Sequence, residues 1–316
     1  MHVRAAHLTA EQHQSMLAPA FLTTATKTVL EHIEGGRFQR SLALVTAGSS
    51  LVSGLEVAYE HYKGSYSNPI MYTPVLLSGV VSLTSLGAVF SRRMATGAMR
   101  WACVVTLVDG AIGFGFHVRG IARKPGGWKL PVTNVIMGPP IFAPLLFGTA
   151  AYLGLMASYL RREEDPPRDE SERVRHTGWR REINEGQFQK HLAAVAAVWT
   201  VLSGVEALYS HYKSRFRIWA QWTPVLLSPV QLGACMGAIF SKRVADRMLP
   251  VTSSLAMLNG GVGFFYHVRG ILRRPGAEKT WLYNILYGPP VFAPLLFAAC
   301  GALGVLASLL RRESGE

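Results

Sequence analysis

Long apolar runs separated by short polar and basic segments dominate the sequence. Four such runs lie in its first half, at 41–61, 72–90, 99–118 and 135–160. A helix needs about 20 apolar residues to cross roughly 30 Å of hydrocarbon. These runs therefore predict four membrane-spanning helices in this half of the chain.

The second half of the chain repeats the first. Residues 37–163 align with residues 187–313 without a gap, and 56 of the 127 aligned positions are identical. A repeat of this length indicates a duplicated structural unit. The sequence thus predicts an all-α integral membrane protein with eight transmembrane helices in two four-helix repeats. Because each repeat has an even number of spans, both repeats enter the membrane from the same side and are parallel.

Two segments outside the repeats, residues 1–36 and the charged linker 164–186, are expected on the cytoplasmic side. The loops on the side that holds both termini and the linker carry more of the Lys and Arg residues than those on the other side. By the positive-inside rule, both termini are predicted to be cytoplasmic, in the inner membrane of a bacterium.

Prolines mark the starts of two spans. Thr73 and Pro74 resemble an N-cap followed by proline at the first helical position. The triplet 138–140, Gly-Pro-Pro, is expected near the start of the fourth span, and Pro144 is expected to bend that helix.

The composition agrees with a membrane protein. Hydrophobic residues make up 49% of the chain and charged residues 16%, against roughly a quarter charged in soluble domains. The formal net charge of +13 could indicate nucleic-acid binding, but the basic residues lie in short clusters between apolar runs and form no nucleic-acid-binding module. The predicted partner is the lipid bilayer, and nucleic acid is excluded.

Histidines end two of the predicted spans in each copy. His61 ends the first span and His117 the third, and these spans run in the same direction. Both imidazoles should therefore lie at one depth, near the non-cytoplasmic face, as should His211 and His267 in the second copy. Ionisable residues in spans are costly and usually functional, so the four histidines are candidate metal ligands.

Glycines precede these histidines at helical spacing, four or seven residues earlier, which places them on the same helix face. Close helix packing through small residues is one interpretation of this stripe. A flat ligand lying on the glycines is the other. The six positions are Gly54, Gly110 and Gly113, with their counterparts Gly204, Gly260 and Gly263.

The second interpretation predicts a haem b in each copy. Two imidazoles from two helices can be the axial ligands of one haem iron, with the macrocycle along the glycines. The propionates would meet basic residues at the same end through charge-assisted hydrogen bonds. Interfacial snorkelling is the alternative for these residues, which are Lys63, Arg119, Lys213 and Arg269.

One glutamate lies within the first span of each copy, Glu56 and Glu206. Two histidines and a carboxylate can bind non-haem iron or zinc. However, Glu56 precedes His61 by five residues, about 140° around a helix, so the two share no metal unless the helix breaks. Each glutamate is a candidate catalytic group, as a proton or quinol contact. The alternative is a buried acid neutralised by Lys63.

Three functional hypotheses follow. The first is a redox protein of b-type cytochrome character that passes electrons between a partner protein on the non-cytoplasmic side and quinone. The second is a metal-dependent membrane enzyme that pools the Glu and His residues of both copies around iron or zinc ions. The third is a transporter or assembly scaffold in which these residues are structural, so whether the chain is an enzyme stays open.

Overall fold

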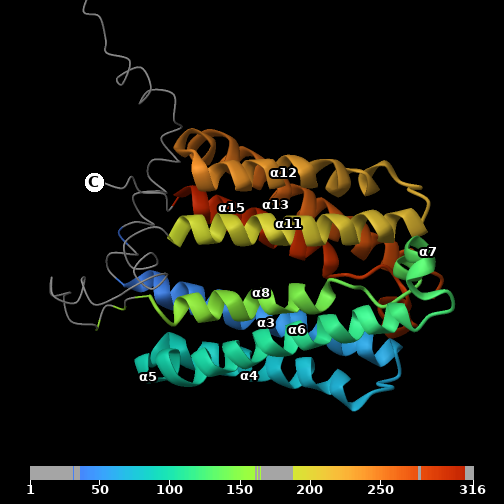
Figure 1. Ribbon diagram of the computed structural model, residues 1–316, viewed down its shortest axis with the longest axis horizontal. Helices are drawn as coiled ribbons and strands as arrows, with labels where there is room; N and C mark the ends of the chain where they lie inside the picture. The colour runs from blue at the N-terminus through green and yellow to red at the C-terminus, as the bar shows by residue number, and fades with distance from the viewer. Residues whose placement is uncertain are drawn as a thin grey trace, which may run out of the picture.

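The computed structural model describes residues 31, 36–160, 162, 164, 188–276 and 279–309. Every regular element within these ranges is a helix. The long helices lie side by side along one axis, and the connections between them gather at the two ends of the bundle (Figure 1). The predicted segment 1–36 and linker 164–186 fall almost wholly outside the described residues.

The first half of the chain forms a bundle of four main helices. These are α3 (Arg37–Lys63), α4 (Thr73–Phe90), α6 (Arg100–Ala122) and α8 (Ala143–Ala157). Helix α3 packs against α4 and α8, and α6 packs against α8 and α4. Short helical pieces join them: η1 (Pro69–Tyr72), α5 (Arg92–Met94), the π-helical turn η2 (Ala95–Met99), η3 (Gly127–Lys129) and α7 (Pro131–Ile136).

The second half has the same order of main helices, and its α13 is one continuous helix where the first half has α5, η2 and α6. Its helices are α11 (Phe188–Lys213), η4 (Trp219–Gln221), α12 (Thr223–Phe240), α13 (Lys242–Leu272), α14 (Trp281–Tyr287) and α15 (Ala293–Leu309). The bounds of α12 lie 150 residues after those of α4, which is the offset of the sequence alignment. Helices α3 and α11 start at the same end of the bundle (Figure 1).

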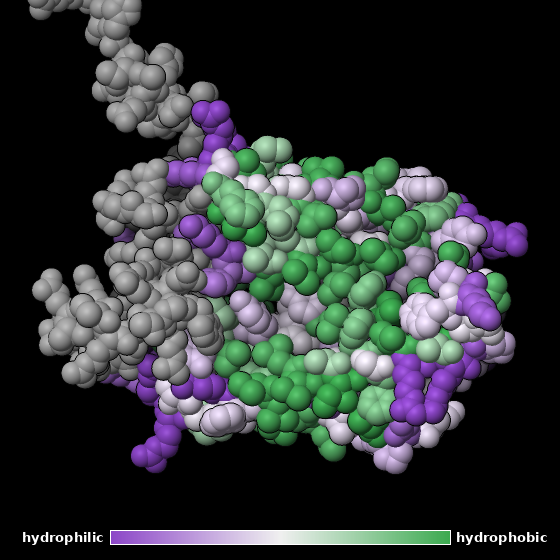
Figure 2. All heavy atoms as spheres, in the orientation of Figure 1, coloured by the Kyte–Doolittle hydropathy of each residue, from purple (hydrophilic) through white to green (hydrophobic). Residues whose placement is uncertain are grey.

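Six helical segments among the described residues are long and apolar enough to cross a membrane. Apolar side chains cover the middle of the visible face, and hydrophilic ones gather towards its two ends (Figure 2). Over the described residues the protein is thus an all-helical membrane protein with six candidate spans. These are Arg37–Lys63, Pro69–Phe90, Arg92–Ala122, Gln189–Lys213, Trp219–Phe240 and Lys242–Leu272.

The predicted continuous span over 135–160 is wrong, because the chain breaks within it. Helix α7 ends at Ile136 and α8 starts at Ala143, with the Gly-Pro-Pro triplet 138–140 between them. Consecutive prolines lack backbone N–H groups and restrict the residue before them, so the helix cannot continue. The remaining α8 and α15 have 15 and 17 residues, or about 23 Å and 26 Å at 1.5 Å per residue, less than a typical hydrocarbon core.

The starts of α8 and α4 differ from the prediction, each at one residue. Pro144 lies in the first turn of α8, where its missing N–H has no helical partner to lose, so it starts the helix rather than bending it. The N-cap of α4 is Tyr72 rather than Thr73. The Thr73 hydroxyl instead lies 2.8 Å from the Ile70 carbonyl oxygen and 2.7 Å from Asp109 Oδ1, which links α4 to α6.

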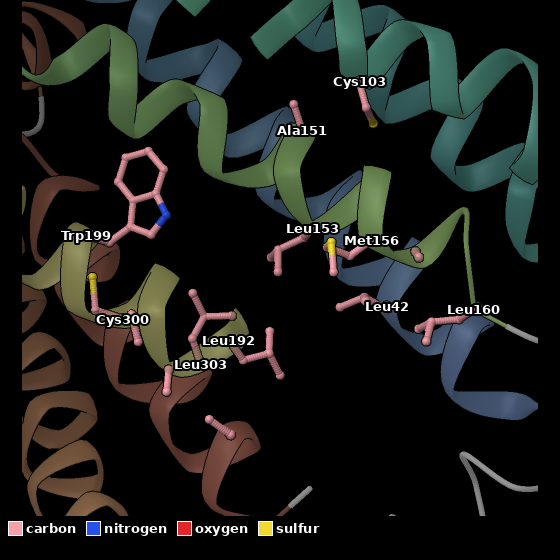
Figure 3. Close-up of a cluster of buried hydrophobic side chains, with 14 of the residues drawn as sticks. Leu42, Cys103, Ala151, Leu153, Met156, Leu160, Leu192, Trp199, Cys300 and Leu303 are labelled. Carbon is pink, nitrogen blue, oxygen red and sulfur yellow. The ribbon is translucent and has the colours of Figure 1, made fainter. Parts of the chain in front are cut away.

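Buried apolar residues of both halves meet at one end of the bundle. Leu153 and Met156 of α8 and Leu42 of α3 lie in one cluster with Leu192 of α11 and Leu303 of α15 (Figure 3). Among lipid chains, which are as apolar as leucine, such contacts stabilise through close packing rather than through exclusion of water. This cluster joins the two halves at the end where α3 and α11 begin.

Arginines satisfy helix carboxyl ends at that same end. The fully buried Arg162 donates to the carbonyl oxygens of Ala88 and Val89, at 3.1 and 3.3 Å, in the last turn of α4. Arg100 donates to the Ser158 carbonyl oxygen at 2.8 Å, just after α8. The last carbonyls of a helix have no partner within it, so these guanidinium groups supply donors that the backbone lacks.

Candidate functional site

The four predicted histidines gather at the opposite end, which we call the histidine end. It comprises residues 61–72 and 117–142 with their counterparts 211–222 and 267–292. His61 lies in the last turn of α3 and His117 near the end of α6. His117 interacts electrostatically with His61, and His211 with His267. The two histidines of each copy thus lie within electrostatic range of each other.

Three of the four imidazoles bind a backbone carbonyl oxygen through Nδ1. His61 Nδ1 lies 2.6 Å from the Met71 oxygen, and His117 Nδ1 lies 2.6 Å from the Pro140 oxygen. His267 repeats the contact of His117, at 2.5 Å from the Pro290 oxygen. Since a carbonyl oxygen only accepts, Nδ1 carries the hydrogen. In the neutral ring Nε2 then keeps its lone pair, as in histidines that ligate metals.

The acceptors of these bonds lie where the helices are interrupted. Met71 belongs to the short helix η1, and Pro140 to the break between α7 and α8. In a bilayer, a backbone oxygen with no partner costs several kcal/mol, of the order seen for any unpaired polar group in hydrocarbon. The histidines therefore stabilise irregular backbone, and the same hydrogen bond orients each ring.

The fourth histidine has different surroundings. Within the part of the chain that the structure describes, no carbonyl oxygen accepts from His211 Nδ1. Gln221 stands where the first copy has Met71, and it donates to Ser214 Oγ at 2.9 Å. Ser214 in turn donates to the His211 carbonyl oxygen at 2.8 Å. The two copies are therefore not equivalent at this position.

A strained turn follows α3 and α11, and the sequence analysis did not predict it. Ser65 and Tyr66 have φ of 58° and 44°, and Arg215 and Phe216 have 58° and 48°. Left-handed backbone costs roughly 1–2 kcal/mol for a residue with a side chain. Stacked rings cover each turn: Tyr66 on Tyr72, with centroids 4.2 Å apart, and Phe216 on Trp222, at 3.9 Å.

The strained turns hold the backbone of the histidines. The Tyr66 N–H donates to the His61 carbonyl oxygen at 3.0 Å, and the Phe216 N–H donates to that of His211 at 3.1 Å. The Tyr66 hydroxyl also donates to the Ala58 carbonyl oxygen at 3.0 Å. Because neither turn contains glycine at these positions, the usual signal of a left-handed turn is missing from the sequence.

The predicted glycine strips are covered by neighbouring helices. A Cβ on Gly54 would overlap the Ser78 side chain of α4, and a Cβ on Gly110 would lie 2.8 Å from the Pro144 carbonyl oxygen of α8. A Cβ on Gly113 would lie 3.1 Å from Pro144 Cβ. The strip of α3 therefore faces α4, whereas the strip of α6 faces α8.

The second copy shows the same packing. Gly204 lies against Ser228, and Gly260 and Gly263 lie against Pro294. Protein atoms therefore already lie over these six glycines, where the flat ligand was expected. Close packing through small residues explains the stripe.

The carboxylates of the two copies lie close enough to interact. Glu56 interacts electrostatically with Glu60 and, across the two halves, with Glu206. The Tyr209 hydroxyl donates to Glu206 Oε1 at 3.3 Å. Lys63 Nζ lies 3.3 Å from both Glu60 oxygens. The sequence suggested an ion pair between Lys63 and Glu56. In the structure, the ion pair of Lys63 is with Glu60.

The structure places two sets of predicted ligands differently: the pooled Glu and His residues for a metal ion, and the basic residues for haem propionates. The described residues contain no group of three His, Cys, Asp or Glu side chains placed to hold a metal ion, so the pooled Glu and His set is not formed there. The basic residues Lys63, Lys213 and Arg119 are exposed at the histidine end, and Arg269 is partly exposed.

Comparison with known proteins adds no family to this picture. No protein-family model matches the sequence, and neither a curated protein nor a solved structure shows significant similarity to the chain.

Replacing Gly110 with alanine tests the glycine packing. We expect Gly110→Ala to destabilise the protein by about 1–3 kcal/mol, since overpacking pushes α6 from the α8 backbone. The matched control is Gly115→Ala on the same helix, where a Cβ meets nothing within 4 Å. Unfolding in mixed micelles would measure both. Equal stability of the two variants would contradict the close α6–α8 contact.

Proposed function

We propose that this chain is an integral membrane protein of b-type cytochrome character. His61 with His117, and His211 with His267, would ligate one haem b iron in each half. The observation that carries the proposal is the hydrogen bond from Nδ1 to a backbone carbonyl at three of these four rings. It leaves Nε2 as the nitrogen available to an iron on each of these three rings.

The proposed topology follows the duplication. The short helices α8 and α15 would complete eight spans in two parallel repeats, with both termini in the cytoplasm and the histidine end on the non-cytoplasmic side. A parallel repeat brings its duplicated sites to the same face. The matching bounds of α4 and α12, and the common starting end of α3 and α11, support this arrangement.

The residues at the histidine end fit a haem in part. The imidazoles offer the right nitrogen, and Lys63, Arg119, Lys213 and Arg269 supply cationic partners for propionates at the same end. The haem would not lie on the six glycines, because neighbouring helices cover them. A bound haem would supply a one-electron couple. The carbonyl bonds would orient the rings and keep Nε2 deprotonated before any iron binds.

Because both proposed sites lie at one end, they would not carry electrons across the bilayer by themselves. The proposed role is lateral transfer between a partner protein on the non-cytoplasmic side and quinone. Electron transfer to quinone needs protons, and Glu56 and Glu206 would carry them from within the candidate spans.

An absorption spectrum of the detergent-purified protein tests this function. We expect a Soret band that shifts on reduction with dithionite, and two haems per chain by pyridine haemochrome. His117→Leu should remove one of the two, because it deletes one ligand of the first pair. The neighbouring variant Phe116→Leu is the control and should keep both. Lack of a Soret band after expression with added haem would refute the proposal, as would full haem content in His117→Leu.

A second candidate function is proton-coupled transport. The observation that favours it is the approach of Glu56, Glu60 and Glu206 across the two halves, within spans. Carboxylates inside a membrane protein mark proton and ion pathways more often than structural sites. In this account the histidines serve only the interrupted backbone.

Proton flux into proteoliposomes tests the second candidate. With a trapped pH-sensitive dye and an imposed potassium diffusion potential, wild-type protein should acidify the lumen faster than empty liposomes. Glu206→Gln should lower this flux at least tenfold, because it removes a proton carrier. Asp109→Asn is the matched control, since the second copy has Asn259 there and Asp109 is not one of the three carboxylates. Wild-type flux at the level of empty liposomes would exclude proton transport.

A further inference from the structure

A cleft of about 350 Å³ lies between the two halves of the chain, and no residue of the proposed haem sites lines it. Its walls come from α6 and α8 of the first half and from one face of α11 of the second. The lining is almost wholly apolar, apart from the polar atoms of three ring side chains. Those three are Tyr152, His191 and Trp199.

The cleft lies within the membrane-spanning part of the molecule. Leu107 and Gly110 belong to the candidate span Arg92–Ala122, and Val195 and Trp199 to the candidate span Gln189–Lys213. Any ligand of the cleft is therefore a molecule that dissolves in the bilayer. A volume of this size is at the small end of small-molecule sites, which are mostly apolar with a few placed polar groups.

The ring side chains of the cleft are found in one half only. At the pseudo-equivalent place between α13, α15 and α3, Ala302 replaces Tyr152, Ser49 replaces Trp199 and Ser41 replaces His191. Ala298 also replaces Gly148, and its Cβ packs into the space beside Gly260. The duplicated fold therefore forms without the three ring side chains and without the space that Gly148 leaves open in the cleft.

The rings are placed to contact a ligand of defined shape. Trp199 is 8% exposed, and its indole extends from α11 towards α8 (Figure 3). Indole N–H, phenol O–H and imidazole N–H groups donate hydrogen bonds, and indole and phenol rings stack on flat rings. An acyl chain would use none of these donors, and a phospholipid headgroup lies at the membrane surface rather than between spans.

We propose that this cleft binds an isoprenoid quinone. The flat quinone ring would lie beside Trp199 and Tyr152, its carbonyl oxygens would accept from the donors of the cleft, and its apolar tail would extend into the bilayer. Naming the quinone as a redox partner rests on the proposed cytochrome function. The binding site itself rests only on the cleft and on its restriction to one half.

Titration of the detergent-purified full chain with ubiquinone-1, followed by calorimetry, tests the site. We expect saturable binding of one molecule per chain. The variant Gly148→Ala with Tyr152→Ala installs the residues of the second copy and should weaken binding at least tenfold. It should still fold, because a Cβ on Gly148 meets only Leu107 Cδ2, at 3.4 Å. Ala298→Gly, at the pseudo-equivalent place, is the control and should bind as wild type does.

Three results would overturn the site: no saturable binding, equal affinity in the double variant, or a tightly held phospholipid that ubiquinone-1 does not displace, as shown by mass spectrometry of extracted lipids. The test is separable from that of the cytochrome. Saturable binding by a protein without a Soret band would refute only the haem. Two haems per chain without quinone binding would refute only the cleft.

Discussion

The hydrogen bonds between imidazole Nδ1 and backbone carbonyl oxygens are the constraint on which the histidine end depends. Helices α4 and α8 both begin next to irregular backbone, whose carbonyl oxygens lack the partners that a regular helix supplies. His61 and His117 come from the ends of α3 and α6 and donate to Met71 and Pro140. Each of these hydrogen bonds thus satisfies a backbone carbonyl oxygen. It also selects the tautomer with the hydrogen on Nδ1, which leaves Nε2 available. A structural role and a ligand role use opposite nitrogens of the same ring, so neither excludes the other.

The two ends of the bundle differ in how they are held. At the end where α3 and α11 begin, apolar contacts join the halves, and Arg100 and Arg162 bind helix carboxyl ends. At the histidine end, the contacts are polar, and the turns at Ser65 and Arg215 are strained. Strained backbone persists only where the surroundings impose it. Here the stacked aromatic rings do so, which makes this end a rigid support for the side chains it carries.

Much of the helical pattern was predictable, because long apolar runs allow few alternatives in a bilayer. The run 72–90 became α4, which starts at Thr73 and ends at Phe90. The break at 138–142 was missed, since an apolar window does not register that consecutive prolines end a helix. The glycine stripes left two interpretations open because one spacing serves both packing and ligand binding, and the packing against Ser78 and Pro144 could be seen only in the fold. The turn at Tyr66 lacked glycine and left no local signal. The gathering of the four histidines at one end was predicted from the direction of their helices, whereas their carbonyl partners depend on the fold.

Solid-state NMR of the protein labelled with ¹⁵N-histidine and reconstituted in lipid without added haem measures the central interaction directly. The account predicts that His61, His117 and His267 are protonated at Nδ1 and carry no hydrogen on Nε2, with the Nδ1–H coupled to a carbonyl carbon of residue 71, 140 or 290. Site assignment by single His→Asn variants would identify each signal. Rings protonated at Nε2, with no hydrogen on Nδ1, would contradict the account. The hydrogen bond to the backbone carbonyl and the unprotonated Nε2 would then both be absent.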